Sequence, residues 1–297
     1  MAAPLIECIP NFSEGRDPEV LGAIKLAIAS VPGVLVLRSE MDPDHNRAVI
    51  TFAGSPEDVA QGALRGIGVA VERIDLRKHS GVHPRMGAAD VVPFVPLENA
   101  SLADCVRIAR QVGGEVWNRL GVPVYFYEAA ASSPERTALE KVRRGGFNRP
   151  VLAPDLGGPA LHPSAGACII GARKLLIAFN VNLDAADLSI ADSIARKIRG
   201  SSGGLPSLKA IGVSLASRGL VQVSMNLTDF ERTGLYEAFK AVEREAALRG
   251  VAIAGTQIVG LVPNKAIEAA AASDPRWNDF DRDLILENRL AEMRALK

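Results

Sequence analysis

Short runs of β-branched and aliphatic residues alternate along the chain with longer stretches in which apolar residues recur every three or four positions. The short runs have the length and composition of buried strands, and the longer stretches have the period of amphipathic helices. Because the two types alternate, the pattern predicts the α/β or α+β class. The predicted strands cover residues 33–38, 48–52, 91–95, 122–127, 175–181, 209–215, 221–226 and 251–259.

Five of the predicted helices begin with a recognisable first turn. Asp17-Pro18 and Ser55-Pro56 each place a capping side chain directly before a proline at the first helical position. A polar residue followed three positions later by an acid, the spacing of a capping box, occurs at Ser101, Asp184 and Thr228. These signals indicate where the helices start.

The order of the elements predicts the architecture. Strand, helix, hairpin, helix and strand follow one another twice, from Leu5 to about Tyr127 and from Leu175 to about Val259. Each copy is a split βαβ pattern, βαββαβ in order. We therefore predict an α/β protein, an α+β sandwich, of two related subdomains, each a mixed sheet covered by helices, with a ligand cleft between them. A Gly- and Pro-rich stretch precedes the expected boundary, which gives subdomains at residues 1–172 and 173–297.

The composition narrows the class of protein. The 34 basic and 34 acidic residues cancel, so no overall field draws the chain to nucleic acid or to an anionic membrane. No run of ~18 apolar residues and no cleavable leader is visible. We therefore expect a cytoplasmic protein that binds neither nucleic acid nor a membrane. Cys8, Cys105 and Cys168 are far apart and odd in number, which favours reduced, buried thiols over disulfides.

Candidate chemistry is concentrated in residues 77–87, which contain two histidines, three cations, two glycines and a proline. Imidazole, with a pKa of about 6.5, can both accept and donate a proton near neutrality. A lone histidine is most often a surface residue or a core residue with satisfied hydrogen bonds, but clustering with glycines and cations favours function. His83, before a proline and next to Arg85, is therefore the first candidate for an acid/base catalyst.

A metal site is the alternative interpretation of the same segment. His79 and His83 have the spacing of paired zinc ligands, and His45 would be a third. That pair works best on a helix, whereas Gly81 and Pro84 indicate a loop, so we predict no metal.

Two other segments have the composition of ligand-binding loops. Residues 154–167 offer backbone donors with little side-chain obstruction, although glycine-rich loops are more often plain turns. Residues 10–16 connect a strand to a helix start, where an anion can bind, although they would serve equally as a helix cap. No phosphate-binding P-loop, nucleophile elbow or CxxC pair is present.

These segments, with others along most of the chain, resemble the motifs of the formiminotransferase family. The opening motif and the polar hairpin of the family are similar to residues 7–15 and 42–47, and its segment with the catalytic histidine is similar to residues 83–88 followed by 90–94. Further matches follow in the family's order at residues 171–174, 177–180, 222–227 and 259–263.

The resemblance implies an activity. Members of the family transfer the formimino group of N-formimino-L-glutamate to tetrahydrofolate, as co-substrate, in histidine degradation and one-carbon metabolism. Their substrates lie in a tunnel between two subdomains, and the enzymes are usually homodimers. The chain contains no segment like a cyclodeaminase domain, so we expect a separate cyclodeaminase to act on the product.

The resemblance also implies site residues. His83 would be the acid/base catalyst, and Arg85, Arg47 and Lys174 are the candidate partners for the carboxylates of the donor. Asn11 comes from the opening motif, and Glu40 stands before the polar hairpin where vertebrate relatives have aspartate. Some relatives have tryptophan in place of Ala165, so an aromatic face for the pterin is missing here. The loop expected to contact folate consists of Gly157, Gly158, Pro159, Ala160, Leu161, His162, Pro163, Ser164, Ala165 and Gly166.

Two other functions stay open at this stage. The same site would suit a related folate enzyme that uses formyl-glutamate or 5-formyl-tetrahydrofolate, because a formyl oxygen differs from a formimino nitrogen by one hydrogen-bonding group. A non-catalytic folate-binding or partner-binding protein would keep the scaffold without turnover.

Overall fold

The computed structural model describes residues 3–80, 85–274, 277 and 280–296 of the chain. The described chain divides into two compact units, Met1–Lys174 and Leu175–Lys297. Each unit has its own sheet and its own buried core.

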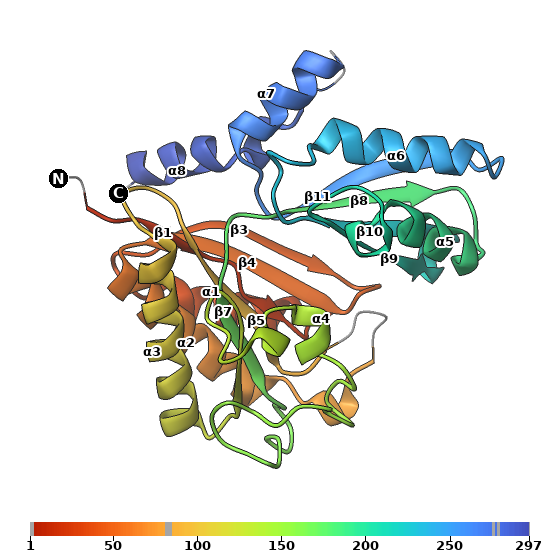
Figure 1. Ribbon diagram of the computed structural model, residues 1–297. Helices are drawn as coiled ribbons and strands as arrows, with labels where there is room; N and C mark the ends of the chain where they lie inside the picture. Colours follow the sequence, from red (N-terminus) through yellow and green to blue (C-terminus); the bar gives the residue numbers. More distant parts are fainter. Residues whose placement is uncertain (1–2, 81–84, 275–276, 278–279, 297) are drawn as a thin grey trace. The chain divides into compact units, whose positions relative to one another are not determined.

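The first unit is built on a seven-stranded sheet (Figure 1). From one edge of the sheet to the other, the order begins with β3 and β4. The two short strands β1 and β2 come next, and each pairs with β4 on one side and with β5 on the other. After β5 follow β7 and β6. Strands β5, β7 and β6 run parallel, and the other pairings are antiparallel, so the sheet is mixed. The strands are β1 Ile6–Cys8, β2 Asn11–Phe12, β3 Leu35–Asp42, β4 Arg47–Gly54, β5 Ala89–Pro96, β6 Val124–Glu128 and β7 Cys168–Ala172.

Three helices cover one face of this sheet: α1 Pro18–Ala29, α2 Pro56–Arg73 and α3 Leu102–Leu120 (Figure 1). Their apolar stripes pack on alternate strand residues, because successive side chains of a strand point to opposite faces. On the other face, the short helix α4 Leu139–Val142 packs beside Tyr125 and Tyr127. The half of that face formed by β3, β4 and β2 carries polar side chains, which are described with the site below.

The second unit repeats the order predicted from sequence. It runs β8 Ile177–Leu183, α5 Leu188–Ile198, β9 Leu208–Leu215, β10 Leu220–Leu227, α6 Leu235–Ala247 and β11 Ile253–Val259, followed by α7 Asn264–Ser273 and α8 Leu286–Ala295. The spatial order β11-β8-β10-β9 matches β5-β1-β4-β3 in the first unit. The prediction of two related βαββαβ units is therefore confirmed, but the first copy ends with β5 at Pro96 and not at about Tyr127, because α3 and β6 follow it as additional elements. The pairings among these four strands are antiparallel, so the mixed character belongs to the first sheet.

Three of the predicted helix starts are confirmed, and two are wrong. Asp17, Ser55 and Ser101 cap α1, α2 and α3, and Ser101 forms the complete capping box with Asp104. The cap of α5 is Asp187 rather than Asp184, since Asp187 accepts from the amide of Ser189 at 2.9 Å.

Thr228 does not cap a helix either. Its hydroxyl donates to the carbonyl of Ser207 (3.0 Å), and Asp229 accepts the amides of Arg232 and Thr233 in a turn. Helix α6 begins only after Gly234. The threonine is thus used to fasten the end of β10, and the local spacing of a capping box is misleading here.

The three cysteines are buried and free, as predicted. Burial raises the pKa of the Cys105 thiol to about 12, and burial followed by the charge of Glu7 raises the pKa of Cys8 well above its usual value. Separately, none of the helices in the described ranges combines the length and the apolar character needed to cross a bilayer.

Candidate active site

A small polar pocket lies at one end of the first sheet. Strand β2 is antiparallel to β4 and β5, so the end of β2 meets the starts of both neighbours. The hairpin between β3 and β4 and the segment after the first 3-10 turn close the same end. The pocket is lined by Ser13, His45, Asn46, Arg47, His79, Arg85 and Asp90.

The hairpin is held in shape by two side chains. Asp42 accepts the amides of Asp44 (2.9 Å) and His45 (3.0 Å), and its second oxygen lies 3.0 Å from Nδ1 of His45. Asn46 has a positive φ of 46°, which asparagine tolerates better than most residues. Its side chain accepts from the amide of Gly15 (2.9 Å) and donates to the carbonyl of Ser80 (2.8 Å), so it joins three segments at the pocket.

The charge of Asp42 stabilises this hairpin in a pH-dependent way. Burial alone would raise the pKa of Asp42, but the side-chain and backbone hydrogen bonds of His45 outweigh it and lower the pKa from 3.8 to about 2. Because the folded-state pKa is depressed, the stabilisation is present above pH 3.8 and is lost as pH falls through about 2. We predict that Asp42→Asn lowers the free energy of unfolding by about 1–2 kcal/mol at pH 6.

Urea unfolding of both proteins between pH 6 and pH 2.5 checks this prediction. The difference between wild type and Asp42→Asn is expected to shrink steadily below pH 4, because Asp42 is then being protonated in the unfolded wild-type chain while most of the folded protein still carries the charge. A difference that does not change with pH would show that the charge of Asp42 contributes nothing.

His79 is held as a neutral ring beside Arg85. Burial, followed by the positive charge of Arg85, lowers the pKa of His79. Its Nε2 lies 3.0 Å from the carbonyl of Asn46, so the neutral ring donates there. Nδ1 is buried and, within the described part of the protein, makes no hydrogen bond. From its spacing to His83, His79 was a candidate only for a metal ligand, whereas the structure places it in the pocket with Arg47 and Arg85.

The predicted catalyst, His83, lies outside the described residues, which resume at Arg85. The segment that follows it is firmly held. Asp90 accepts the amides of Met86 (2.6 Å) and Gly87 (3.2 Å) and forms an ion pair with Arg143. Arg85 donates to the carbonyl of His79 at 2.7 Å. Residues 85–87 therefore have a fixed position at the pocket.

Two of the predicted carboxylate-binding residues, Arg47 and Arg85, meet in this pocket. Burial, followed by the charge of Arg143, lowers the pKa of Arg47 to about 10, so the guanidinium stays charged at neutral pH. The pocket is lined by two guanidinium groups, those of Arg47 and Arg85, and by the carboxylate of Asp90. Because the positive charges outnumber the negative one, the pocket suits an anionic ligand. The third candidate, Lys174, is not brought here.

Lys174 lies at the opposite end of the parallel strands. Ile169 of β7 is paired with Val91, next to the pocket, and Lys174 follows beyond the end of β7. At the usual rise of a strand, that separation is roughly 15 Å. Within the first unit, Lys174 is exposed and remote from Arg47 and Arg85.

Asn11 and Glu40 lie on the sheet face that α1, α2 and α3 do not cover. Glu40, Val49, Asn11 and Val91 are in register across four strands, so their side chains point to one face. Arg47, two positions before Val49 on β4, belongs to the same face. Asn11 donates to the carbonyl of Ile9 (3.0 Å), and Glu40 forms an ion pair with Arg38 (2.7 Å). Asn11 and Glu40 themselves do not line the pocket.

The predicted folate loop, residues 157–166, ends beside the segment that follows His83. Ala88 donates to the carbonyl of Ala165 (2.9 Å), and Ala167 donates to that of Met86 (3.0 Å). Gly166 has a φ of 69°, and a Cβ there would lie 2.1 Å from the carbonyl oxygen of Met86, so only glycine fits. The loop and the pocket are thus joined by backbone contacts.

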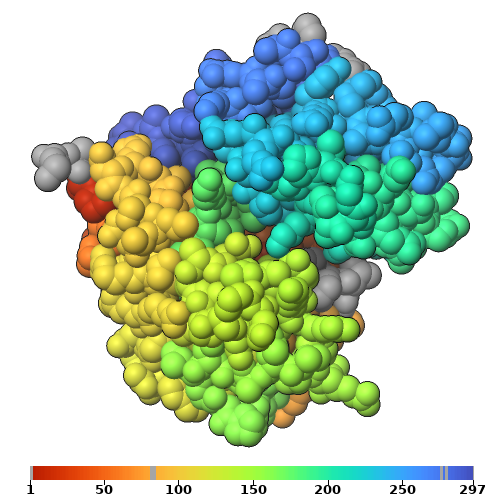
Figure 2. All heavy atoms as spheres, viewed as in Figure 1, coloured from red at the N-terminus to blue at the C-terminus, as the bar shows by residue number. Residues whose placement is uncertain are grey.

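Different parts of this loop are exposed to different degrees. Gly158, Pro159 and Ala160 are exposed, and the green segment that contains them lies at the surface in Figure 2. The methyl group of Ala165, by contrast, is 1% exposed and packs in the core on the helix side of the sheet. Ala165 therefore contacts the neighbouring segment through its backbone carbonyl, which accepts from Ala88, and not through its side chain.

Among the described residues, no group of three His, Cys, Asp or Glu side chains is placed to hold a metal ion. The rings of His45 and His79 are both engaged, with Asp42 and with Asn46 respectively. The third histidine of the metal interpretation, His83, is outside the described residues.

Comparison with known families identifies the kind of protein to which this fold and pocket belong. A family profile described as formiminotransferase domain, N-terminal subdomain, matches residues 5–173, and one described as formiminotransferase domain matches residues 178–276. Together they cover most of the chain. The protein belongs to the formiminotransferase family.

The relatives extend along the same length. The glutamate formimidoyltransferase of Streptococcus pyogenes serotype M1 is 43% identical over 296 residues, which is 97% of this chain and 99% of that protein. The glutamate formimidoyltransferase of Thermoplasma acidophilum is 45% identical over 295 residues, 96% of this chain and 97% of that protein. The formimidoyltransferase-cyclodeaminase of Sus scrofa is 44% identical over 280 residues, 90% of this chain and 52% of that protein.

Proposed function

We propose that this protein is a glutamate formimidoyltransferase, an enzyme that transfers the formimino group of N-formimino-L-glutamate to tetrahydrofolate and releases L-glutamate. The observation that carries the proposal is the pocket in which Arg47 and Arg85 lie beside a neutral His79. The names of two relatives similar over nearly their whole length support the same activity.

The proposed reaction needs one proton carrier. N5 of tetrahydrofolate attacks the carbon of the protonated formimino group, and a new N–C bond forms as the π pair of the C=N bond moves onto the imino nitrogen. His83 takes the proton that N5 loses. In the collapse of the tetrahedral intermediate that pair re-forms the C=N bond, the bond between the carbon and the glutamate nitrogen breaks, and the His83 imidazolium protonates the nitrogen as it leaves. The products are 5-formimino-tetrahydrofolate and glutamate, and the imidazole returns to its starting state.

Arg47 and Arg85 are assigned to the carboxylates of the donor. A charged hydrogen bond is worth about 1.5–3 kcal/mol, which corresponds to roughly 10- to 100-fold in binding. We predict that Arg85→Ala and Arg47→Ala each raise the KM for N-formimino-L-glutamate by that factor, with a smaller change in the KM for tetrahydrofolate. Steady-state kinetics with each substrate varied in turn provides the measurement.

Arg77→Ala is the matched control for these two variants. Its side chain is 62% exposed and pairs with Asp75, away from the pocket, although it belongs to the same cation-rich segment. It is expected to leave both KM values unchanged. An Arg47 or Arg85 variant that behaves like Arg77→Ala would remove that arginine from the proposed donor site.

The activity itself is tested by offering the purified protein tetrahydrofolate with either N-formimino-L-glutamate or N-formyl-L-glutamate and measuring released glutamate. The proposal predicts turnover that favours the formimino donor by at least tenfold. A preference for the formyl donor would assign the related folate reaction instead. Binding of folate without release of glutamate from either donor would indicate a non-catalytic folate-binding protein.

Four further properties form part of the proposal and rest on the family. We expect a cytoplasmic homodimer that acts in histidine degradation, and we expect its formimino product to be the substrate of a cyclodeaminase. Light scattering of the eluted protein measures the oligomeric state directly.

A further inference from the structure

The residues just before the proposed folate loop are fastened to strand β6. The amides of Asp155 and Leu156 both donate to the carbonyl of Val124, at 2.8 and 3.1 Å, and the amide of Val124 donates back to Leu156 at 2.9 Å. The hydroxyl of Tyr125 donates to the carbonyl of Leu152 (2.7 Å). The chain therefore reaches Gly157 from a fixed direction.

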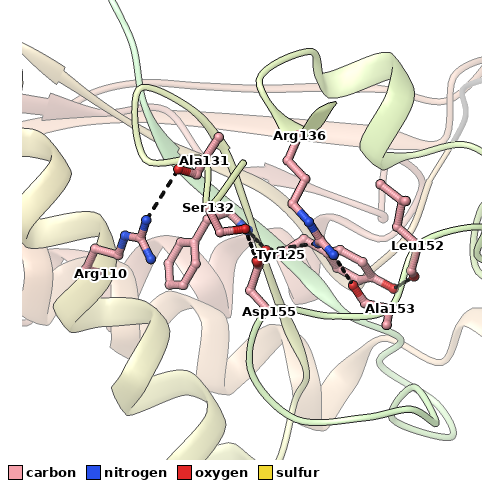
Figure 3. Close-up of polar contacts among 9 residues, drawn as sticks. Arg110, Tyr125, Ala131, Ser132, Arg136, Leu152, Ala153 and Asp155 are labelled. Atoms are coloured by element: carbon pink, nitrogen blue, oxygen red, sulfur yellow. Dashed lines mark hydrogen bonds and ion pairs between the residues drawn. The ribbon is translucent and has the colours of Figure 1, made fainter. Parts of the chain in front are cut away.

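The carboxylate of Asp155 is the centre of this attachment (Figure 3). It is 9% exposed and accepts from the amide of Phe126 (2.8 Å), from Nη1 of Arg136 (3.1 Å) and from the hydroxyl of Ser132. Arg136 also donates to the carbonyl of Ala153 at 2.8 Å. Asp155 therefore has three donors, and one of them, Arg136, is also its ion-pair partner. A buried carboxylate bonded in this way holds its neighbours far more tightly than a surface salt bridge does.

The loop departs from this anchor against an aromatic ring. Gly157 has a φ of 77°, and a Cβ built there would lie 2.6 Å from the ring of Trp117 on α3. Trp117 is 38% exposed, so one part of its ring faces solvent beside the loop. The position of Gly157 is thereby set between the Asp155 anchor and the Trp117 ring.

The middle of the loop has backbone groups to offer a ligand. Within the described part of the chain, residues 157–161 make no hydrogen bond, whereas His162 and Gly166 exchange two backbone bonds of 2.9 Å. Four amides of residues 157–161 can donate, since only Pro159 lacks an N–H. The anchors fix the two ends of the segment that carries these amides.

We propose that Asp155, locked by Arg136, is a positioning residue for tetrahydrofolate: it fixes the start of the loop 157–166 so that its unbonded amides meet the folate. This inference deepens the proposed function and rests on it. Asp155 does not lie among the pocket residues, so its effect is expected on folate and not on the glutamate donor.

The test compares Asp155→Asn with wild type, both in a Trp277→Phe background. The chain has two tryptophans, so Trp117 is then the sole indole and its emission reports on the neighbouring Gly157. The variant is expected to shift the Trp117 emission, to weaken quenching by 5-formyl-tetrahydrofolate about tenfold, and to raise the KM for tetrahydrofolate about tenfold. The KM for N-formimino-L-glutamate is expected to stay within about twofold.

Two further variants complete the test. Ser132→Ala removes one donor to Asp155 and keeps the ion pair, so it is expected to change the Trp117 emission and the folate affinity in the same direction by a smaller amount. It replaces Asp155→Asn in the test if that variant folds poorly. Arg110→Ala is the matched control, because Arg110 packs 4.5 Å from the centre of the Phe126 ring and bonds Ala131 but does not touch Asp155. It is expected to leave folate binding unchanged.

The outcomes separate the two proposals. Equal effects on both substrates, or an unchanged affinity for 5-formyl-tetrahydrofolate, would overturn the positioning role of Asp155. A shift in Trp117 emission with weakened folate binding, in a protein that turns over neither donor, would retain that role and reject the proposed transfer reaction.

Discussion

His83→Ala is expected to retain the fold and to lose ~10²–10⁴-fold in kcat, because a positioned acid/base catalyst contributes that much to a proton transfer. Hydrogen bonds of Asp90 and Arg85 hold residues 85–87 at the pocket. The measurement is glutamate release by wild type and variant at saturating substrates, with the thermal unfolding midpoint as the check on folding.

His79→Gln is the comparison that makes this prediction specific. His79 is the neutral imidazole found in the pocket, and its buried Nδ1 is unbonded within the described chain. If His83 carries the proton, His79→Gln is expected to lower kcat by no more than about tenfold, and the pH profile keeps its shape. A loss in His79→Gln as large as that in His83→Ala would transfer the role of proton carrier to His79.

Asp90→Ala is expected to have the largest effect on stability. The carboxylate is 3% exposed, pairs with Arg143 and accepts two amides, so its removal leaves a buried guanidinium and two N–H groups without their acceptor. Breaking a buried ion pair by removing one partner costs about 3–5 kcal/mol. Urea unfolding at neutral pH is the measurement.

The double variant Asp90→Ala/Arg143→Met separates charge from packing. Because it removes both members of the pair, it is expected to regain part of the stability lost in Asp90→Ala. If Asp90→Ala costs less than about 1 kcal/mol, the pair does not hold the segment after His83 in the way that its geometry indicates.

Much of the fold could be predicted from local signals. Helices α1, α2 and α3 start where a capping side chain and a proline or an acid coincide. Thr228 shows the limit of such signals: the spacing of a capping box is present, but a hydrogen bond to Ser207, distant in sequence, takes the hydroxyl. Local patterns cannot foresee a competing tertiary partner.

The pocket was predictable only in part, for the same reason. Arg47 and Arg85 were expected from their charge and their place in the motifs, and both line it. Ser13 was expected only as part of the loop 10–16, and His45 only as a possible metal ligand. Asn46 and Asp90 were not singled out, because separate segments bring the lining residues together. One signal was available: Asp90 opens a strand whose next residues are all apolar, and an acid next to a buried strand needs a partner.

The most direct test of the proposed transfer follows the single carbon that moves. N-formimino-L-glutamate labelled with ¹³C in the formimino group is mixed with the enzyme and tetrahydrofolate, and the label is observed by NMR. The labelled carbon is expected to appear on N5 of tetrahydrofolate in a one-to-one ratio with free glutamate, and neither product is expected to form without tetrahydrofolate. Label that stays on glutamate, or that is released as formamide or formate with no folate adduct, would contradict the proposed transfer.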